Sequence, residues 1–170
     1  MDKLYLDLLK VIFNKLDFLS QIRFRQISKL HYSNLHIIDL YHIHYKYLEL
    51  LNDEILKNYP YIEFLNAFDN RKIKNIDHMK NLKILNCSHL CGISDENIKG
   101  LDLTKLYTDF NPKIKNIGHM KNLKVLYCGG NCGIADEDIK DLDLRELYCS
   151  RNPKIKNMSY EKFKNVILWG

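Results

Sequence analysis

Five cysteines are the residues whose chemistry would matter most if they came together. Three residues separate Cys87 from Cys91, and three separate Cys128 from Cys132, so each pair could supply thiolate ligands to zinc. However, Cys87, Cys128 and Cys149 recur at the same inward position of a repeated strand, where a small apolar side chain packs. Cys87 and Cys128 are also two strands apart, which is about 10 Å. We therefore expect reduced, packed thiols without a metal site or a disulfide.

The histidines and glycines do not form a recognisable catalytic set. His78 and His119 lie 41 residues apart at equivalent positions of a duplicated segment. This equivalence indicates surface or packing roles, because a catalytic residue is seldom needed in every copy. Gly129 and Gly130 lack the spacing of a phosphate-binding loop. We expect neither an enzyme nor a cofactor.

Lysines recur in columns that would attract phosphates if they faced outward together. The chain carries a formal net charge of +5, but Asp and Glu are frequent in the turns between these lysines. We therefore favour a solvated edge without a nucleic-acid partner, and a weak anion-binding surface is the alternative. The lysines are Lys72, Lys74, Lys113, Lys115, Lys154 and Lys156.

The elements that position these residues follow from an internal repeat. The segment KIKNIDHMKNLKILNC at 72–87 recurs as KIKNIGHMKNLKVLYC at 113–128, with thirteen of sixteen positions identical. Each 41-residue block holds two units that read L-x-x-L-x-(small)-x-x-N-x-x-I, and this pattern resembles the leucine-rich repeat. The resemblance extends from about Leu35 to the C-terminus. Its units begin near residues 35, 62, 82, 103, 123 and 144, with a partial unit at 166.

A single unit of this kind cannot bury its own apolar face, so the units should stack as a solenoid whose short strands form a parallel sheet. The convex side has room only for single helical turns, apart from a longer helix over 53–59 that Pro60 ends. The asparagine after each strand would bond backbone groups that the turn leaves unpaired, although Leu90 replaces it in one unit. This asparagine ladder comprises Asn70, Asn111, Asn131 and Asn152.

Side chains at the third, fifth and seventh positions of each unit should point to the concave face, away from the core. Tyr107, Tyr127 and Tyr148 fall there on consecutive strands. Aromatic residues with a polar tip are favoured at interfaces, so a protein partner and a self-packed tyrosine ladder are both open interpretations. The predicted partner-binding residues are Phe64, Asn66, Phe68, Lys105, Tyr107, Tyr127, Glu146 and Tyr148.

Residues 1–34 follow a helical pattern instead, in two amphipathic stretches that are interrupted near Asp17, with Ser20 as a candidate N-cap. The string LYLDLLKVIFNKLDFLSQIRFRQISKLHYS resembles the F-box. Tyr5 stands where that family usually has proline, and His31 stands where it often has tryptophan. The resemblance assigns adaptor binding to Leu4, Leu8, Leu9, Ile12, Phe13 and Leu16.

An F-box followed by repeats, over residues 1–34 and 35–170, implies a substrate-recognition subunit of a cullin–RING ubiquitin ligase. Such a subunit binds a Skp-type adaptor through the F-box and a protein target through the repeats. The alternative is a plain repeat scaffold whose N-terminal helices only cap the first unit.

The composition suggests a setting for either function. An excess of Lys over Arg, with abundant Asn, Ile and Tyr, resembles proteins encoded by AT-rich genomes, including those of large DNA viruses of amoebae. Neither a signal peptide nor a run of roughly 18 apolar residues is evident. We therefore expect a cytoplasmic protein, in the host cell if viral, without membrane contact. Val166 to Trp169 would begin a further strand at the C-terminal edge.

Overall fold

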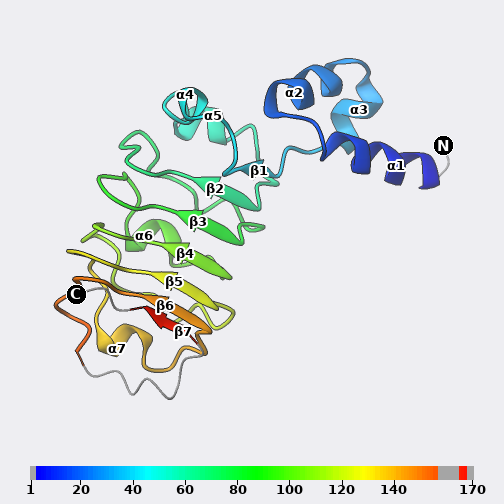
Figure 1. Ribbon diagram of the computed structural model, residues 1–170. Helices are drawn as coiled ribbons and strands as arrows, with labels where there is room; N and C mark the ends of the chain where they lie inside the picture. The colour runs from blue at the N-terminus through cyan, green and yellow to red at the C-terminus, as the bar shows by residue number, and fades with distance from the viewer. Residues whose placement is uncertain (1–2, 157–164, 168–170) are drawn as a thin grey trace.

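The computed structural model describes residues 3–156 and 165–167 and shows a mixed α/β fold around an open, all-parallel sheet (Figure 1). The strands follow one another across the sheet in chain order, so each strand pairs with the one before it. The predicted parallel sheet is confirmed. Its strands are β1 (Asp39–Leu40), β2 (Phe64–Asn66), β3 (Ile84–Asn86), β4 (Lys105–Tyr107), β5 (Val125–Tyr127), β6 (Glu146–Tyr148) and β7 (Asn165–Ile167).

A central leucine explains why such short segments form strands. In β2 to β6 this leucine is buried and its two neighbours are half-buried, as alternation along a strand requires. Parallel pairing places the leucines in one column, which lies within the hydrophobic core. The column consists of Leu65, Leu85, Leu106, Leu126 and Leu147.

The pairing of β1 refines where the first unit begins. Leu40 pairs with Leu65, so the residue equivalent to Ile62 is Ile37 and not Leu35. Both isoleucines are buried, which fits an inward position at the start of each unit.

Asn111 shows how the predicted asparagine ladder works. Its side chain is fully buried, and its Nδ2 donates to the carbonyl oxygens of Cys87, at 2.7 Å, and Ile93, at 3.4 Å. Its Oδ1 accepts a hydrogen bond from the Lys113 N–H at 3.0 Å. The asparagine therefore ties its own turn to the preceding unit. Equivalent bonds are made by Asn70 and Asn152.

The prediction for Asn131 is wrong, because this side chain is exposed and the next residue, Cys132, is the buried one. Cys91 is buried in the same way in the unit where Leu90 interrupts the pattern. There the Ile93 N–H donates to the Cys91 sulfur at 3.4 Å, in place of an asparagine oxygen. Two kinds of turn thus alternate along the chain, one built on asparagine and one on a cysteine one residue later.

Single helical turns follow every second strand: α4 (Tyr45–Leu48) and α5 (Asp53–Leu56) come after β1, α6 (Asp95–Ile98) after β3 and α7 (Asp136–Ile139) after β5. The predicted helix over 53–59 is wrong in its length, since α5 ends at Leu56. The Asn58 amide donates to the carbonyl oxygens of Glu54 and Ile55, so the carbonyl groups of that last turn are satisfied by a side chain.

The first residue of each of α5, α6 and α7 links neighbouring units. The Asp95 carboxylate accepts hydrogen bonds from the backbone N–H groups of Lys115, at 2.7 Å, and Asn116, at 3.0 Å. The stack is therefore joined on its helical side as well as in the sheet. Asp53 accepts the equivalent pair of bonds from Lys74 and Asn75, and Asp136 accepts from the Lys156 N–H with both oxygens.

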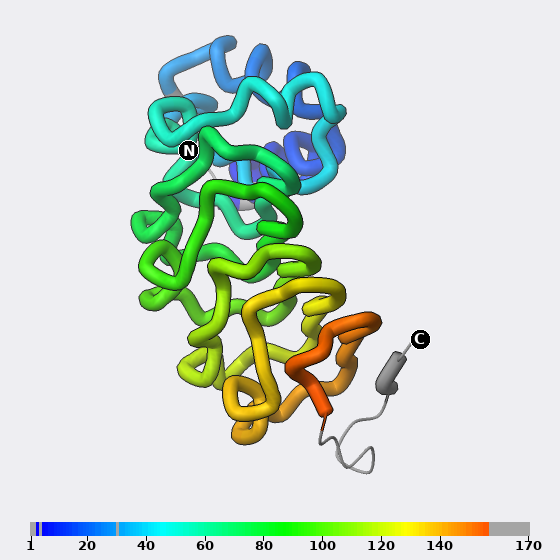
Figure 2. The backbone as a smooth tube through the Cα atoms, turned by 90° about the vertical axis from the view of Figure 1, so that its left-hand side faces the viewer, coloured from blue at the N-terminus to red at the C-terminus, as the bar shows by residue number. Residues whose placement is uncertain are grey.

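Three helices lie at the β1 end of the sheet (Figures 1 and 2). They are α1 (Lys3–Phe13), α2 (Phe18–Gln26) and α3 (Lys29–Asn34). Asp17, and not Ser20, is the N-cap of α2, and its carboxylate accepts hydrogen bonds from the Ser20 N–H and hydroxyl. These hydrogen bonds lower the pKa of Asp17. Leu9 and Phe13 belong to the same core as the strand leucines, so the helices continue the packing of the repeats.

Candidate functional site

The open face of the sheet carries a tyrosine column, which we define as Tyr107, Tyr127 and Tyr148. The ring centroids are 4.4 Å apart between Tyr107 and Tyr127 and 4.0 Å apart between Tyr127 and Tyr148, with interplanar angles of 22° and 5°. Both faces of the Tyr127 ring are therefore covered by neighbours, and burial raises the pKa of its hydroxyl. The rings stabilise one another, which leaves mainly their edges and hydroxyl groups for a partner.

Charged side chains mark the two ends of this column. The Lys105 ammonium lies 5.1 Å from the Tyr107 ring centroid and 5.6 Å from that of Tyr127, within cation–π range. At the other end the Tyr148 hydroxyl donates to the Glu146 carboxylate at 3.3 Å. The surface thus offers a row of polar phenol edges between a cation and an anion.

Tyr41 extends the column, although the repeat pattern did not predict it. It follows β1 at the position that Asn66 holds in β2. Its ring centroid is 6.0 Å from that of Tyr107, because the short side chains of Asn66 and Asn86 leave room between them. Burial, with a hydrogen bond to Tyr107, raises the pKa of Tyr41 to about 12.

Phe68 lies at the edge of the open face, where it lines a pocket of about 680 Å³ together with Asn66. Its ring is exposed and lies 4.7 Å from the His89 ring, which lies 5.0 Å from the Phe110 ring. Gly130 follows in the next unit, and a Cβ there would collide with the Phe110 ring. These rings form an aromatic edge beside the sheet, whereas Phe64 and Asn66 remain half-buried on the open face.

Helix α1 presents a second exposed surface. With about 3.6 residues per turn, Leu9 and Phe13 lie on one side of the helix and Leu8 and Ile12 on another. Leu9 and Phe13 are 8% and 1% exposed, whereas Leu8 and Ile12 are 56% and 44% exposed. Tyr5 and Val11 are also exposed. We define the apolar face of α1 as Tyr5, Leu8, Val11 and Ile12.

The six residues that the F-box resemblance assigns to adaptor binding therefore separate into groups. Leu9 and Phe13 are core residues in this structure, so their contribution to a contact surface would be indirect. Leu16 is half-buried, and the side chain of Leu4 lies outside the described residues. Leu8 and Ile12 are the members that a partner could contact directly.

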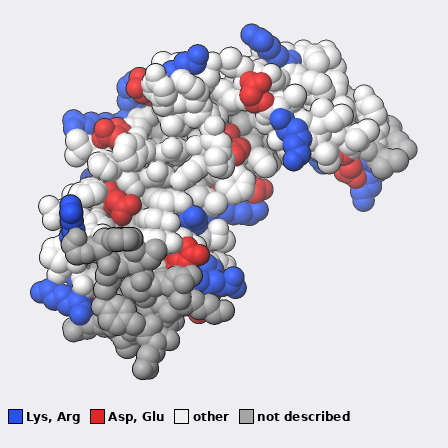
Figure 3. Space-filling model, viewed as in Figure 1, with Lys and Arg blue, Asp and Glu red and all other residues white. Residues whose placement is uncertain are grey.

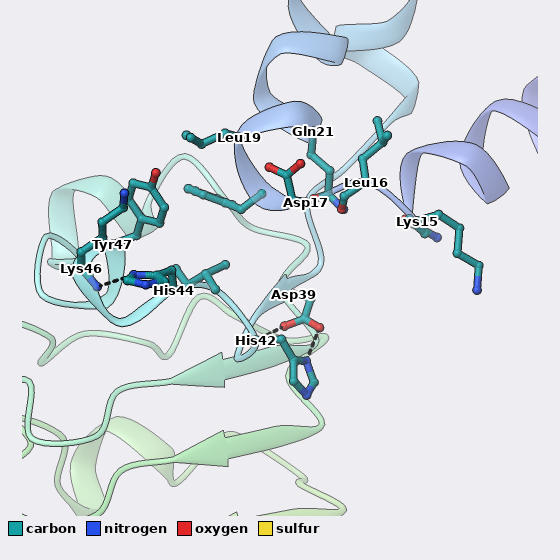
Figure 4. Close-up of a pocket in the computed structure, with 13 residues that line it drawn as sticks. Lys15, Leu16, Asp17, Leu19, Gln21, Asp39, His42, His44, Lys46 and Tyr47 are labelled. Carbon is teal, nitrogen blue, oxygen red and sulfur yellow. Dashed lines mark hydrogen bonds and ion pairs between the residues drawn. The ribbon is translucent and has the colours of Figure 1, made fainter.

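A pocket of about 750 Å³ lies between the α1–α2 junction and the segment from β1 to α4 (Figure 4). Asp39 accepts hydrogen bonds from the Tyr41 and His42 N–H groups, and its second oxygen lies 2.6 Å from His42 Nδ1. The carboxylate could orient the imidazole, but no Ser, Thr or Cys is among the described residues that line this pocket. The contact between Asp39 and His42 therefore stabilises the turn, and no nucleophile lies beside it among these lining residues.

The repeated lysine and histidine side chains contact backbone carbonyl oxygens of the preceding unit. The Lys72 ammonium donates to the Glu49 carbonyl oxygen at 2.9 Å, Lys154 donates to that of Cys132 at 3.0 Å, and Lys113 donates to that of Cys91. His78 Nε2 and His119 Nε2 lie 3.4 Å and 3.2 Å from the carbonyl oxygens of Leu56 and Ile98. Three of the six repeated lysines thus make structural contacts.

All five cysteines are buried and carry free thiols. Burial raises the pKa values of Cys87 and Cys128 well above the usual range, so these thiols stay protonated at neutral pH. Among the described residues, no group of three or more His, Cys, Asp or Glu side chains could hold a metal ion.

No protein-family model matches this chain, and no curated protein matches it. Within the described ranges, no helix has the length and apolar character needed to cross a membrane.

Proposed function

We propose that this chain is a substrate-recognition subunit of a cullin–RING ubiquitin ligase, built from an F-box-like helical segment and a short leucine-rich-repeat solenoid. Residues 1–34 would bind a Skp-type adaptor, and the open face of the sheet would bind a protein target. The chain would carry no active site of its own and would act in the cytoplasm.

The observation that carries this proposal is the apolar face of α1. Four large side chains stand exposed on α1, although Leu9 and Phe13 on an adjoining side of the helix are packed into the core. Exposed apolar groups that cluster in this way mark sites of protein association. Leu8 and Ile12 are also residues that match the F-box pattern. Further exposed apolar side chains are Leu19 on α2, Ile27 directly after α2 and Tyr32 on α3.

The regular stacking of the strands supports the second half of the proposal. Successive units each contribute one strand and one turn, their central leucines form one column, and the asparagine contacts recur in every second unit. Stacked units of this kind provide an extended surface for binding another protein. The tyrosine column, with Lys105 and Glu146 at its ends, is the part of that surface richest in residues favoured at interfaces.

We expect that replacing both Leu8 and Ile12 by Asp abolishes capture of a eukaryotic Skp-type adaptor while the protein stays folded. The complex would bury both of these side chains, so losing their apolar contacts should weaken binding by roughly 100-fold or more. The measurement is adaptor affinity by calorimetry, with circular dichroism to confirm folding. The matched control combines Lys10→Ser in α1 with Asn14→Asp directly after it, which lowers the charge by the same amount away from the apolar face. Equal adaptor binding by the two variants would contradict the proposal.

A second candidate function is that of a repeat scaffold whose N-terminal helices only cap the solenoid. The burial of Leu9 and Phe13 in the core favours this cap. Capping and adaptor binding use different sides of α1, so both can hold. A folded wild-type protein that binds no Skp-type adaptor from relevant hosts would leave the scaffold as the function.

A further inference from the structure

A smaller pocket, of about 360 Å³, lies where α2 and α3 meet the loops of the first unit. Much of its wall is aromatic and comes from Tyr32, Tyr59 and Tyr61. Arg25, on α2, is the cationic residue in it. None of the described residues that line this pocket is Asp or Glu, so the positive charge has no carboxylate beside it there.

The guanidinium of Arg25 packs on an aromatic ring. Its guanidinium carbon lies 4.7 Å from the centroid of the Tyr32 ring. Its Nε is buried, and no described residue accepts a hydrogen bond from it. A buried N–H without an acceptor is unusual in folded proteins. The guanidinium is a rigid fork of donors that suits the paired oxygens of a carboxylate or phosphate.

The electrostatic environment of the pocket is positive. Burial is the main cause that lowers the pKa of His36, and the charges of Arg25 and Lys10 lower it further. The His36 ring stacks on Tyr61, with ring centroids 3.9 Å apart. At Tyr59, burial raises the pKa and the charge of Arg25 opposes that rise. Both side chains therefore lie within the electrostatic influence of Arg25.

We propose that this pocket binds an anionic group, a phosphate or a carboxylate, carried on an apolar body of side-chain size. The fork of Arg25 would bind the oxygens, and the rings of Tyr32, Tyr59 and Tyr61 would cover the apolar body. The volume is near the lower end of pockets that hold small ligands, which fits a side chain or a small aromatic acid better than a nucleotide. This site is separate from the apolar face of α1 and from the tyrosine column.

The test uses phenyl phosphate, benzoate, inorganic phosphate and phenol as probes of the full chain, with affinity measured by calorimetry. Saturable binding of phenyl phosphate or benzoate is expected, and a preference between these two identifies the anion. Phenol and inorganic phosphate should each bind at least about tenfold more weakly, because each lacks one half of the ligand. The absence of saturable binding by both aryl acids would overturn the proposal, as would phenol binding as tightly as they do.

Two pairs of variants locate the binding. Arg25→Gln should lower the affinity for the aryl acid by at least about tenfold. Arg23 is an exposed arginine on the same helix, and Arg23→Gln should change that affinity by less than about twofold. If Arg25→Gln does not fold, Ser33→Asp still tests the site from an exposed position. It should abolish binding by charge repulsion, and its neutral counterpart Ser33→Asn should not. Equal affinities within both pairs would refute the assignment.

Discussion

Asn111→Ala is expected to be the most destabilising of the conservative changes in the turns. The substitution removes both hydrogen bonds to the carbonyl oxygens of Cys87 and Ile93 and the acceptor of the Lys113 N–H. Each buried polar group left without a partner costs about 1–3 kcal/mol, so the free energy of unfolding should fall by roughly 3 kcal/mol or more. Urea unfolding followed by circular dichroism measures this change.

Asn131→Ala is the matched control, because the sequence pattern treats both residues as members of one ladder while the structure exposes Asn131. An exposed substitution away from special contacts should change the free energy of unfolding by less than about 0.5 kcal/mol. If the two alanine variants were equally destabilised, the assignment of the buried place to Cys132 would be incorrect.

Gly133→Ala should also destabilise the protein, by about 1–3 kcal/mol or more, through overpacking. A Cβ at this position would collide with the Ile114 carbonyl oxygen and lie 2.7 Å from that of Pro112. Both obstacles are backbone atoms of the preceding turn, so neither can rotate away. Thermal unfolding gives the measurement.

Gly118→Ala is the corresponding control in the same repeat. The nearest atom to a Cβ there is the Asp138 carbonyl oxygen at 3.8 Å, an ordinary contact distance. Because alanine restricts the unfolded chain more than glycine does, Gly118→Ala should be neutral or stabilising by up to about 1 kcal/mol. A melting temperature lowered equally in both variants would show that the close approach at Gly133 is not what limits the stack.

The repeat predicted the sheet well because its physics is periodic. One leucine per unit fixes which side of a strand is buried, and the recurrence of the motif brings residues such as Leu85 and Leu126 into one column. The stacking of Tyr107, Tyr127 and Tyr148 followed from the same register. Local periodicity therefore sufficed for the open face from β4 to β6.

In the turns and in the first unit, the sequence pattern of one unit did not determine which residue is buried or how the unit aligns with its neighbours. The spacing of Asn131 matched the pattern, and Gly130 before it has a positive φ like Phe110 before Asn111. In the turn after β5, however, Cys132 takes the buried position. Tyr41 was missed because the first unit was aligned on Leu35, and aligning Leu40 with Leu65 would have revealed it.

In the helical segment the sequence identified apolar residues but not which of them face solvent. Leu8 and Leu9 both match the F-box pattern, yet one is exposed and the other buried. That difference depends on which side of α1 enters the core, which Leu9 and Phe13 share with buried residues far along the chain. Tertiary packing therefore decides which matched residues could contact an adaptor directly.

The most direct test of the proposed function is backbone hydrogen–deuterium exchange of the full chain, alone and with an equimolar Skp-type adaptor. We expect slower exchange in α1 and in the neighbouring turns of α2 and α3, with strands β4 to β6 unchanged. Exchange that is identical with and without the adaptor, or protection confined to the open face of the sheet, would contradict the proposal that the N-terminal helices bind it.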